Sequence, residues 1–170
     1  MDSKSSYRTL DSGSSWTRLY LEASLTLGEI VTSGIRRAQV VADPNGIIVG
    51  QANPSYVLTT KDAGNHWSRQ FVANNIDRFW GMAAVEPRSV WIAGVGGAIF
   101  KTYDGGSSWA RQASSTKRTL YSLSAANLMS ACAVGARGTI LVTIDGGNTW
   151  KKQFSKDKKD FVSVTMVQSK

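Results

Sequence analysis

Short apolar runs recur along the chain at intervals that leave no room for a helix of useful length. In one part of the sequence the runs cover residues 79–85, 89–94 and 98–102, and a fourth run covers 109–113. β-Branched, aromatic and small residues dominate these runs, and turn-forming residues bound them, as is typical of short β-strands. Matching runs follow about 41 residues later, so we expect the same unit of four antiparallel strands more than once.

A repeated octapeptide marks the turn between the last two strands of each unit. Its pattern is Thr-x-Asp-x-Gly-x-x-Trp, and it occurs at residues 9–16, 60–67, 102–109 and 143–150. The four aspartates are 51, 42 and 41 residues apart. A repeat of about 40 to 50 residues that contains four strands is the unit of a β-propeller blade. The sequence therefore predicts an all-β propeller of four-stranded antiparallel blades, with no helix longer than two turns.

Aligning the repeats gives the expected blade boundaries. The whole chain, residues 1–170, is predicted to form one domain with three complete blades and a partial blade at each end. A longer surface loop is expected within residues 21–35. The blades are expected at residues 5–20 (two strands), 35–71, 78–113, 119–154 and 161–167 (first strand only).

Two ways of closing such a propeller stay open at this point. The two partial ends would complete a small four-bladed ring, but the shared blade would then lack its second strand. Alternatively, the chain is part of a larger propeller whose other blades come from another chain or from residues outside this sequence. We favour the second arrangement, because native proteins cover bare sheet faces and unpaired edges.

The octapeptide has a structural explanation that needs no ligand. Its Asp is expected to accept hydrogen bonds from backbone N–H groups in the turn, and its Gly permits a positive φ. The Trp is expected to bury its ring against the neighbouring blade or hairpin. Four copies of one pattern favour a structural part, since a catalytic residue is needed once. The residues are Asp11, Gly13, Trp16, Asp62, Gly64, Trp67, Asp104, Gly106, Trp109, Asp145, Gly147 and Trp150.

Composition narrows the classes of function. Twenty Lys and Arg against 12 Asp and Glu give a formal net charge of +8, which favours an acidic partner or an anionic surface. The single cysteine, Cys132, and the single histidine, His66, leave no partner for a disulfide, a multi-cysteine metal site or a His-based triad. We therefore expect no catalytic residue, cofactor or metal. No apolar run approaches the roughly 20 residues of a spanning helix, so a membrane association would be peripheral.

Basic residues recur just before the first strand of successive blades. Connections between blades lie on one face of a propeller, around the central channel, so these side chains could form a basic ring that docks a partner, although basic residues there often only solvate. The run 151–160 is a second basic cluster, expected to be a mobile loop. Nucleic acid is not the expected partner, because the aromatic residues recur at strand positions. The candidate docking residues are Arg36, Arg37, Arg78, Lys117 and Arg118.

The repeat resembles known families. The octapeptide is similar to the Asp-box (BNR) repeat of sialidases and other β-propellers. The stretch 89–109, SVWIAGVGGAIFKTYDGGSSW, resembles the blade repeat of the photosystem II stability and assembly factor family, and residues 129–150 match that pattern as well. Members of this family are lumenal propellers of cyanobacteria and chloroplasts, with about seven blades.

That resemblance implies a non-enzymatic interaction module. It would act as an accessory, stability or assembly subunit of a photosynthetic membrane complex, on the lumenal side of a thylakoid. Its partners would be photosystem subunits, which the family docks through an arginine patch between blades. A structural subunit of another organellar or bacterial assembly that shares the repeat is the alternative.

Sialidase activity is the competing enzymatic hypothesis, and the sequence argues against it. Sialidases need an arginine cluster, a tyrosine nucleophile with its glutamate, and an acid/base aspartate. They also carry an Arg-Ile-Pro segment, but the three prolines here follow Asp43, Asn53 and Glu86. The only glutamates, Glu22, Glu29 and Glu86, fall in the long loop and in a turn. We expect no enzyme.

Overall fold

The computed structural model describes residues 6–8, 17–19, 37–42, 45–49, 56–61, 68–72, 78–86 and 88–167. The first two strands, β1 (Ser6–Arg8) and β2 (Thr17–Leu19), form an antiparallel hairpin. Three four-stranded antiparallel sheets follow, and each runs through its strands in sequence order. The expectation of four-stranded antiparallel blades is confirmed.

The two middle strands of each sheet have four to six residues, whereas the first strand varies from six to eight and the last from two to four. The β3–β6 sheet contains β3 (Arg37–Ala42), β4 (Asn45–Val49), β5 (Tyr56–Thr60) and β6 (Ser68–Phe71). The β7–β10 sheet contains β7 (Phe79–Glu86), β8 (Ser89–Gly94), β9 (Ile99–Thr102) and β10 (Ala110–Arg111). The β11–β14 sheet contains β11 (Leu120–Ala125), β12 (Ala131–Gly135), β13 (Thr139–Thr143) and β14 (Lys151–Lys152).

Only two short 3-10 turns interrupt the strands in the described part of the chain. They are η1 (Val95–Gly97) and η2 (Ala136–Gly138), and each joins the second strand of a sheet to the third. No helix among these described residues is long and apolar enough to cross a membrane. The outer strands β10 and β14 are shorter than the five-residue runs that the sequence suggested, because only two residues of each pair with the neighbouring strand.

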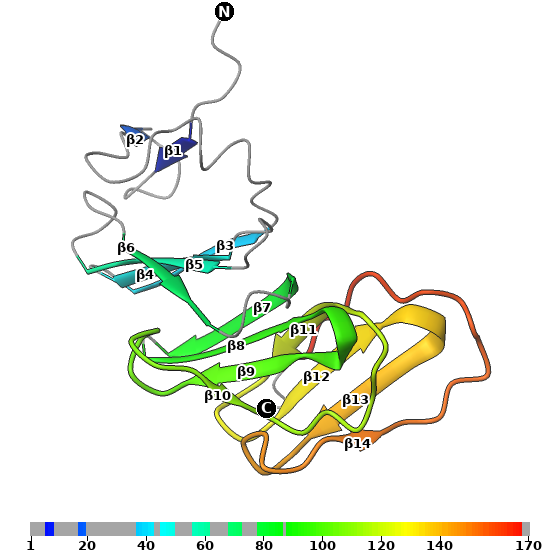
Figure 1. Ribbon diagram of the computed structural model, residues 1–170. Coiled ribbons are helices and arrows are strands. Elements are labelled where there is room, and N and C mark those ends of the chain that lie inside the picture. Colours follow the sequence, from blue (N-terminus) through cyan, green and yellow to red (C-terminus); the bar gives the residue numbers. More distant parts are fainter. Residues whose placement is uncertain are drawn as a thin grey trace, which may run out of the picture.

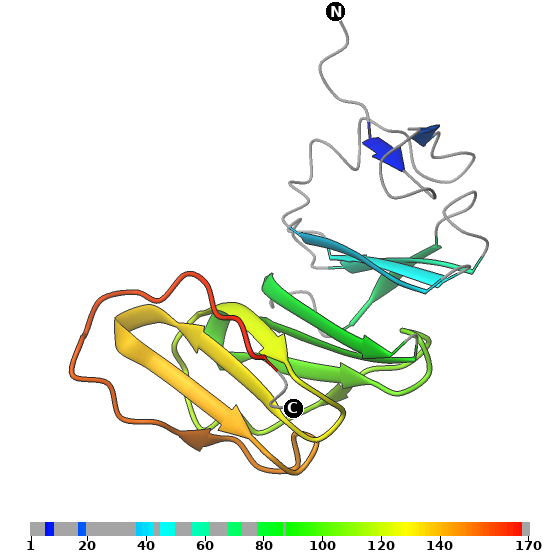
Figure 2. The ribbon, with the colours of Figure 1, turned by 180° about the vertical axis from the view of Figure 1, so that it is seen from behind.

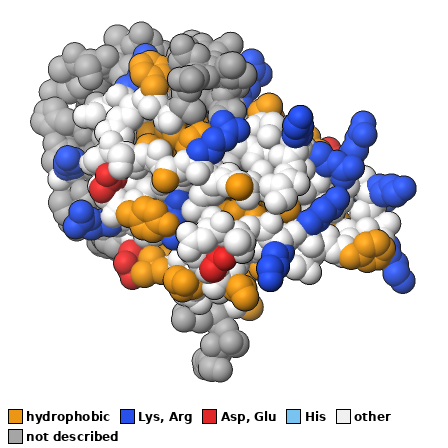
Figure 3. All heavy atoms as spheres, turned by 60° about the horizontal axis from the view of Figure 1, so that its bottom comes forward, with side chains coloured by type: hydrophobic (Ala, Val, Ile, Leu, Met, Phe, Trp, Pro, Cys, Tyr) orange, Lys and Arg blue, Asp and Glu red, His pale blue; other side chains and the backbone are white. Residues whose placement is uncertain are grey.

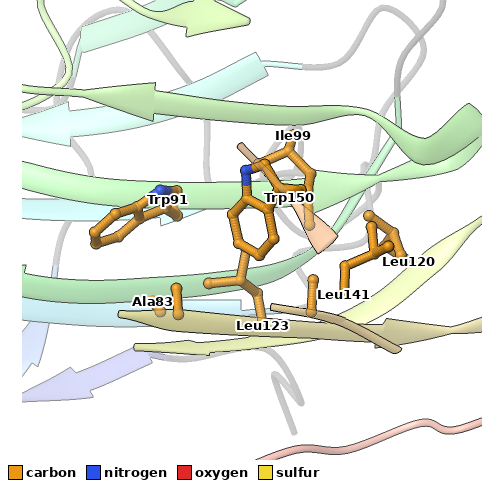
Figure 4. Close-up of a cluster of buried hydrophobic side chains, with 10 residues drawn as sticks. Ala83, Trp91, Ile99, Leu120, Leu123, Leu141 and Trp150 are labelled. Carbon is orange, nitrogen blue, oxygen red and sulfur yellow. The ribbon is translucent and has the colours of Figure 1, made fainter. Parts of the chain in front are cut away.

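Successive sheets stack through their faces and follow one another in an arc (Figures 1 and 2). The interface between the β7–β10 and β11–β14 sheets is an apolar cluster around two tryptophans, Trp91 and Trp150 (Figure 4). Ala83 and Ile99 enter it from one sheet, and Leu123 enters it from the other. Trp91 is completely buried, and truncating such a side chain to Ala typically costs about 3–5 kcal/mol.

The opposite face of the β7–β10 sheet is covered as well. Phe79, Ile92 and Phe100 pack with Val57 of β5 in a second cluster. The rings of Phe79 and Phe100 meet edge to face, with their centroids 5.7 Å apart. The β7–β10 sheet is therefore buried on both faces, which explains why every residue of β8 and β9 is buried.

A buried lysine ties the β7–β10 sheet to the loops of the next one. The Nζ of Lys101 donates hydrogen bonds to the carbonyl oxygens of Leu128 (3.2 Å) and Gly146 (3.0 Å). It also lies 3.7 Å from the centroid of the Trp91 ring and 4.6 Å from that of Tyr103. Burial lowers the pKa of Lys101 to about 8. The two carbonyls and the ring faces supply the partners that a buried ammonium needs.

The segment 161–167 differs from the expected strand. It is extended but belongs to no sheet among the described residues. The N–H groups of Val164 and Met166 donate to the side-chain oxygens of Ser122 (3.3 Å) and Ser124 (3.0 Å) on β11. It therefore lies along β11 as β11 itself lies along β7, at the place of the first strand of a next blade. It forms no ladder because a ladder needs a neighbouring backbone, and here the neighbour is a sheet face.

Candidate functional site

The third and fourth copies of the octapeptide form the same turn. Asp104 Oδ1 accepts hydrogen bonds from Thr102 Oγ1 (2.7 Å) and from the backbone N–H of Ser108 (2.9 Å). Its Oδ2 accepts from Ser108 Oγ at 2.6 Å. Asp145 binds Thr143 and Thr149 with the same three distances. The carboxylate thus joins the two ends of the turn.

In these two copies the opening threonine also accepts hydrogen bonds from the backbone of the turn. Thr102 Oγ1 is buried and accepts hydrogen bonds from the backbone N–H groups of Gly106 (2.8 Å) and Asp104 (3.3 Å). Gly106 and its counterpart Gly147 have φ values of 90° and 93°, a region that side chains disfavour. A glycine is required at this position because the backbone must bend sharply to bring its N–H group onto the threonine.

Hydrogen bonds keep both turn aspartates ionised. Those from the side chain and backbone of Ser108 lower the pKa of Asp104 to about 2. Those from the side chain and backbone of Thr149 do the same for Asp145. Because every donor belongs to the same turn, these carboxylates are held for structure and show no arrangement for acid–base chemistry.

The tryptophan that ends the fourth copy is anchored to the preceding sheet. Trp150 is 3% exposed and its Nε1 donates a 2.9 Å hydrogen bond to Oε1 of Gln112. Gln112 Nε2 donates in turn to the carbonyl of Gly146 at 3.4 Å. In the third copy, Trp109 packs against the cluster that contains Val57. Trp150 is therefore fixed to the preceding sheet, and Trp109 packs against a cluster that its own sheet shares with the preceding one.

The structure describes only part of the residues singled out in the sequence. The first octapeptide and residues 62–67 of the second lie outside the described residues, and Arg36 does too. The candidate residues concerned in these two octapeptides are Asp11, Gly13, Trp16, Asp62, Gly64 and Trp67. Arg37 begins β3, where only the backbone is described. Arg78, Lys117 and Arg118 are all exposed. Arg78 directly precedes β7, and its carbonyl accepts the N–H of Val95 in η1 at 2.8 Å.

One of these basic residues, Arg118, lines a groove together with residues that are distant from it in the sequence. The groove has a volume of about 600 Å³, and four cationic side chains line it: Arg118, Arg137, Lys152 and Lys158. Arg118 Nη1 donates to the carbonyl of Arg137 at 3.0 Å. Asp157 is the one acidic residue among the lining residues, and Phe154, 86% exposed, is the apolar one. Lys and Arg side chains gather on the right of Figure 3, and few acidic side chains lie among them.

A second groove lies at the equivalent place one repeat earlier. It measures about 500 Å³ and includes Gly96, Arg111 and Lys117. Gly96, Arg111 and Lys117 precede Arg137, Lys152 and Lys158 by 41 residues. In these two repeats the connection that follows the fourth strand therefore builds a groove, and the later groove carries more positive charge.

The basic segment that borders the first groove is hydrogen-bonded to η2 and is not the free loop that its sequence suggested. The N–H of Gly138 donates to the carbonyl of Lys159 (2.6 Å), and the N–H of Arg137 donates to Asp160 Oδ1 (2.9 Å). Asp157 Oδ1 accepts the N–H of Lys159 at 2.8 Å. A side chain at Gly138, whose φ is 67°, would overlap the carbonyl of Asp157. The groove wall is thus fixed by backbone contacts.

Arg137 escaped the sequence analysis although it is central to this groove. Its φ is 54°, a value uncommon for residues other than glycine, and Gly96 holds the equivalent position in η1 with φ 68°. The sequence signal for this residue was an arginine at a turn position where the preceding repeat has a glycine. Gln112 was missed as well, although Gln70, Gln112 and Gln153 each follow a motif tryptophan by three residues.

The described residues offer no metal site, since no three His, Cys, Asp or Glu side chains among them are grouped to hold an ion. Cys132 is a buried residue of β12, and burial raises the pKa of its thiol. These features leave the basic groove as the candidate functional site.

The model of the family described as photosynthesis system II assembly factor YCF48 matches residues 8–125. No curated protein matches the chain. Among solved structures, YCF48 bound to D1 peptide has a TM-score of 0.65 at 22% identity and covers 75% of this chain and 41% of its own.

Two further structures extend this picture. YCF48 from Cyanidioschyzon merolae has a TM-score of 0.55 at 27% identity and covers 64% of this chain and 35% of its own. The GH74 xyloglucanase from Xanthomonas campestris has a TM-score of 0.63 at 16% identity and covers 88% of this chain and 27% of its own. The xyloglucanase shares the propeller fold only. The chain spans about two fifths or less of the length of these solved proteins.

Proposed function

The chain belongs to the photosystem II assembly factor YCF48 family, and from this membership we propose that it is a non-enzymatic docking module for a photosystem II protein. Its role would be that of an accessory, stability or assembly subunit of the photosynthetic membrane complex. It would act from the lumenal side of the thylakoid, as a peripheral protein. The partner would be a protein segment, with nucleic acid excluded from the proposal.

The observation that carries this proposal is the basic groove at the junction of η2 with the 154–160 connection. A YCF48 protein of the same fold has been solved bound to a D1 peptide, so a member of the family binds a photosystem polypeptide. In this chain, the groove lined by Arg118, Arg137, Lys152 and Lys158 has the size and charge for such a segment. We propose that it receives an acidic or carboxylate-terminated peptide.

The lining residues would contribute different contacts to recognition of the peptide. Arg118 and Arg137 present guanidinium groups, which bind carboxylates with paired, charge-assisted hydrogen bonds. Lys152 and Lys158 add positive potential that attracts an acidic segment over a range of about 8 to 10 Å at moderate ionic strength. The exposed ring of Phe154 offers apolar contact to the peptide side chains. The proposed docking residues Arg78 and Lys117 would extend the basic surface outside this groove.

The octapeptide turns take no direct part in this proposal. The carboxylate oxygens of Asp104 and Asp145 accept hydrogen bonds within their own turns. Their role would be to hold the strands that position the groove. These hydrogen bonds explain both aspartates without a catalytic role in a sialidase mechanism.

A peptide titration tests the docking role. A fluorescent acidic peptide with a free C-terminal carboxylate should bind the intact chain, and binding should weaken steeply as salt is raised. The double variant Arg118→Ala/Arg137→Ala should lose at least tenfold in affinity. Lys61→Ala/Arg88→Ala is the matched control, because it also removes two positive charges and both residues are exposed and line neither groove. Equal losses in the two variants would show that net charge alone drives binding and would contradict the proposal.

A further inference from the structure

The strand ends that carry the octapeptide turns present exposed apolar side chains where the β7–β10 and β11–β14 sheets meet. Tyr103 follows β9 in the third octapeptide and is 59% exposed. Leu128 and Met129 lie in the turn from β11 to β12 and are 37% and 52% exposed. Single exposed apolar residues are common on protein surfaces, whereas a contiguous group of them marks an interaction site. We call these three side chains the rim patch.

Contacts around one buried lysine bring the two turns together. The Nζ of Lys101 lies 4.6 Å from the centroid of the Tyr103 ring and donates a 3.2 Å hydrogen bond to the carbonyl of Leu128. It also donates to the carbonyl of Gly146, whose N–H donates in turn to the carbonyl of Met129 at 2.9 Å. The three residues of the rim patch are therefore neighbours, although they come from two different sheets.

Hydrogen bonds fix the backbone of both turns. Asn127 Oδ1 accepts the N–H groups of Met129 (2.9 Å) and Ser130 (2.8 Å). On the other turn, the carboxylate of Asp104 holds the octapeptide next to Tyr103. A surface whose backbone is already ordered loses little conformational entropy when it binds a partner, which favours affinity.

The fold does not require apolar side chains at these positions. One repeat earlier, Lys61 precedes Tyr103 by 42 residues and Arg88 precedes Met129 by 41, and both cations are exposed. The carbonyl of Arg88 accepts the N–H of Gly105 at 3.1 Å, so the turn forms equally well with an arginine in it. The apolar side chains of the rim patch are therefore better explained by binding than by folding.

The local charge at the rim patch is negative. Hydrogen bonds from Ser108 and Thr149 hold the pKa of Asp104 and of Asp145 at about 2, so both carboxylates are ionised. The charge of Lys101 is buried beneath the patch. Hydrophobic side chains with acidic ones among them lie in the lower part of Figure 3. Ionised carboxylates are costly to bury in a bilayer and repel anionic lipids, so this surface favours a protein partner.

The rim patch lies at the opposite end of the strands from the basic groove. The turn η2 lines the groove and directly precedes β13, whereas the fourth octapeptide begins at the end of β13. In the preceding sheet, η1 and the third octapeptide flank β9 in the same way. The patch and the groove would therefore bind different segments.

We propose that the rim patch is a second protein-docking surface, which binds an apolar segment that carries Lys or Arg beside its apolar side chains. Tyr and Met are enriched at protein interfaces, and the flexible Met side chain adapts to apolar surfaces. Asp104 Oδ2 accepts a hydrogen bond from Ser108 Oγ. An ionised carboxylate oxygen can accept two, which leaves capacity for a cation of the partner. The ring of Tyr103 would offer its face to the same cation.

Binding of defined peptides tests this proposal without using the docking groove. In fluorescence anisotropy, a labelled peptide of alternating Leu and Lys should bind the intact chain. A peptide of alternating Gly and Lys should bind at least tenfold more weakly. Tyr103→Ser/Met129→Ser should weaken binding of the Leu–Lys peptide at least tenfold. Phe71→Ser/Val162→Ser is the matched control and should bind normally, because it also removes two exposed apolar side chains but leaves the patch intact.

A second variant protects the test against loss of folding. Met129→Arg places an arginine where Arg88 stands in the same turn one repeat earlier. The far-ultraviolet circular dichroism should therefore stay unchanged, while binding of the Leu–Lys peptide weakens at least tenfold. Arg118→Ala/Arg137→Ala should not weaken this binding. A tenfold loss in that variant would place the peptide in the docking groove and would overturn the proposal.

Other results would also contradict the rim patch as a protein-docking surface. These are failure of the Leu–Lys peptide to bind, equal affinity for the Gly–Lys peptide, and unchanged binding in Tyr103→Ser/Met129→Ser. Vesicles of phosphatidylcholine and phosphatidylglycerol provide the remaining comparison. If they bound the intact chain but not Tyr103→Ser/Met129→Ser, the patch would be a membrane contact and the proposal would be wrong.

Discussion

Gln112 and Trp150 form a side-chain hydrogen bond across the interface between the β7–β10 and β11–β14 sheets. The indole Nε1 of Trp150 donates a 2.9 Å hydrogen bond to the amide oxygen of Gln112, at the edge of the apolar cluster. The ring contributes apolar burial and the amide fixes its orientation. Gln112, like Lys101, thus links the two sheets from a position outside the repeated octapeptide.

Removing this amide should destabilise the protein. Gln112→Ala leaves the N–H of a 3% exposed tryptophan without its partner, which typically costs about 1–3 kcal/mol. Urea denaturation followed by tryptophan fluorescence measures the loss. Gln153 occupies the same place one repeat later and is exposed, so Gln153→Ala is the matched control and should change the free energy of unfolding by less than about 0.5 kcal/mol. Equal losses for the two variants would contradict the assigned role of Gln112.

Within the octapeptide turn, the threonine should matter more than the aspartate. Thr102→Val keeps the shape of the side chain but leaves the buried N–H of Gly106 unpaired, at a cost of about 1–3 kcal/mol. Asp104→Ala removes bonds to Ser108, which is exposed to water, and should cost about 1 kcal/mol, as the loss of a helix cap does. Thermal unfolding of the two variants compares them directly. A larger loss for Asp104→Ala would show that the carboxylate holds the turn.

Lowering the pH from about 4 toward 2 should remove the contribution of the turn aspartates to the free energy of unfolding. The folded pKa of Asp104 and of Asp145 is about 2, whereas an unfolded aspartate titrates near 3.9. The unfolded chain therefore binds these protons first, so their stabilisation is complete above about pH 4 and is lost as the pH falls toward 2. Unfolding measured at pH 5, 4 and 3 should show this decline. The double variant Asp104→Asn/Asp145→Asn should have a flatter profile, and an unchanged slope would contradict the assignment.

A higher salt concentration should weaken peptide binding and leave the stability of the fold almost unchanged. The proposed groove uses solvent-exposed cations, whose attraction for an acidic peptide is screened at high ionic strength. Raising NaCl from 50 to 500 mM should weaken peptide binding at least tenfold while the thermal midpoint moves by only a few degrees. Differential scanning fluorimetry in the same buffers provides the second quantity. Peptide affinity that does not respond to salt would place the binding energy outside the groove.

The strands and the octapeptide turn could be predicted because their causes are local. Alternation of apolar residues and the repeated Thr, Asp and Gly act within a few residues of one another, and the pattern appears four times in the sequence. The four-stranded sheets and the positive φ at Gly106 and Gly147 follow from these local patterns.

The parts that sequence reasoning missed depend on contacts between repeats. The partner of Gln112 lies 38 residues away in the next sheet, and the first repeat carries Leu19 at this position, which hides the pattern. Arg137 lines the groove because the 3-10 turn η2 places its carbonyl within hydrogen-bond distance of Arg118. Segment 161–167 has the composition of a strand, but a ladder requires a neighbouring backbone that composition cannot supply.

The central claim is that the chain docks on a photosystem II protein through its basic groove, and co-purification tests it most directly. Tagged chain should be incubated with detergent-solubilised thylakoid membranes and recovered, and the bound proteins identified by mass spectrometry. We expect photosystem II subunits to be retained by the intact chain and by Lys61→Ala/Arg88→Ala, and to be lost with Arg118→Ala/Arg137→Ala. Recovery of no photosystem II subunit, or equal recovery with the double variant, would contradict it.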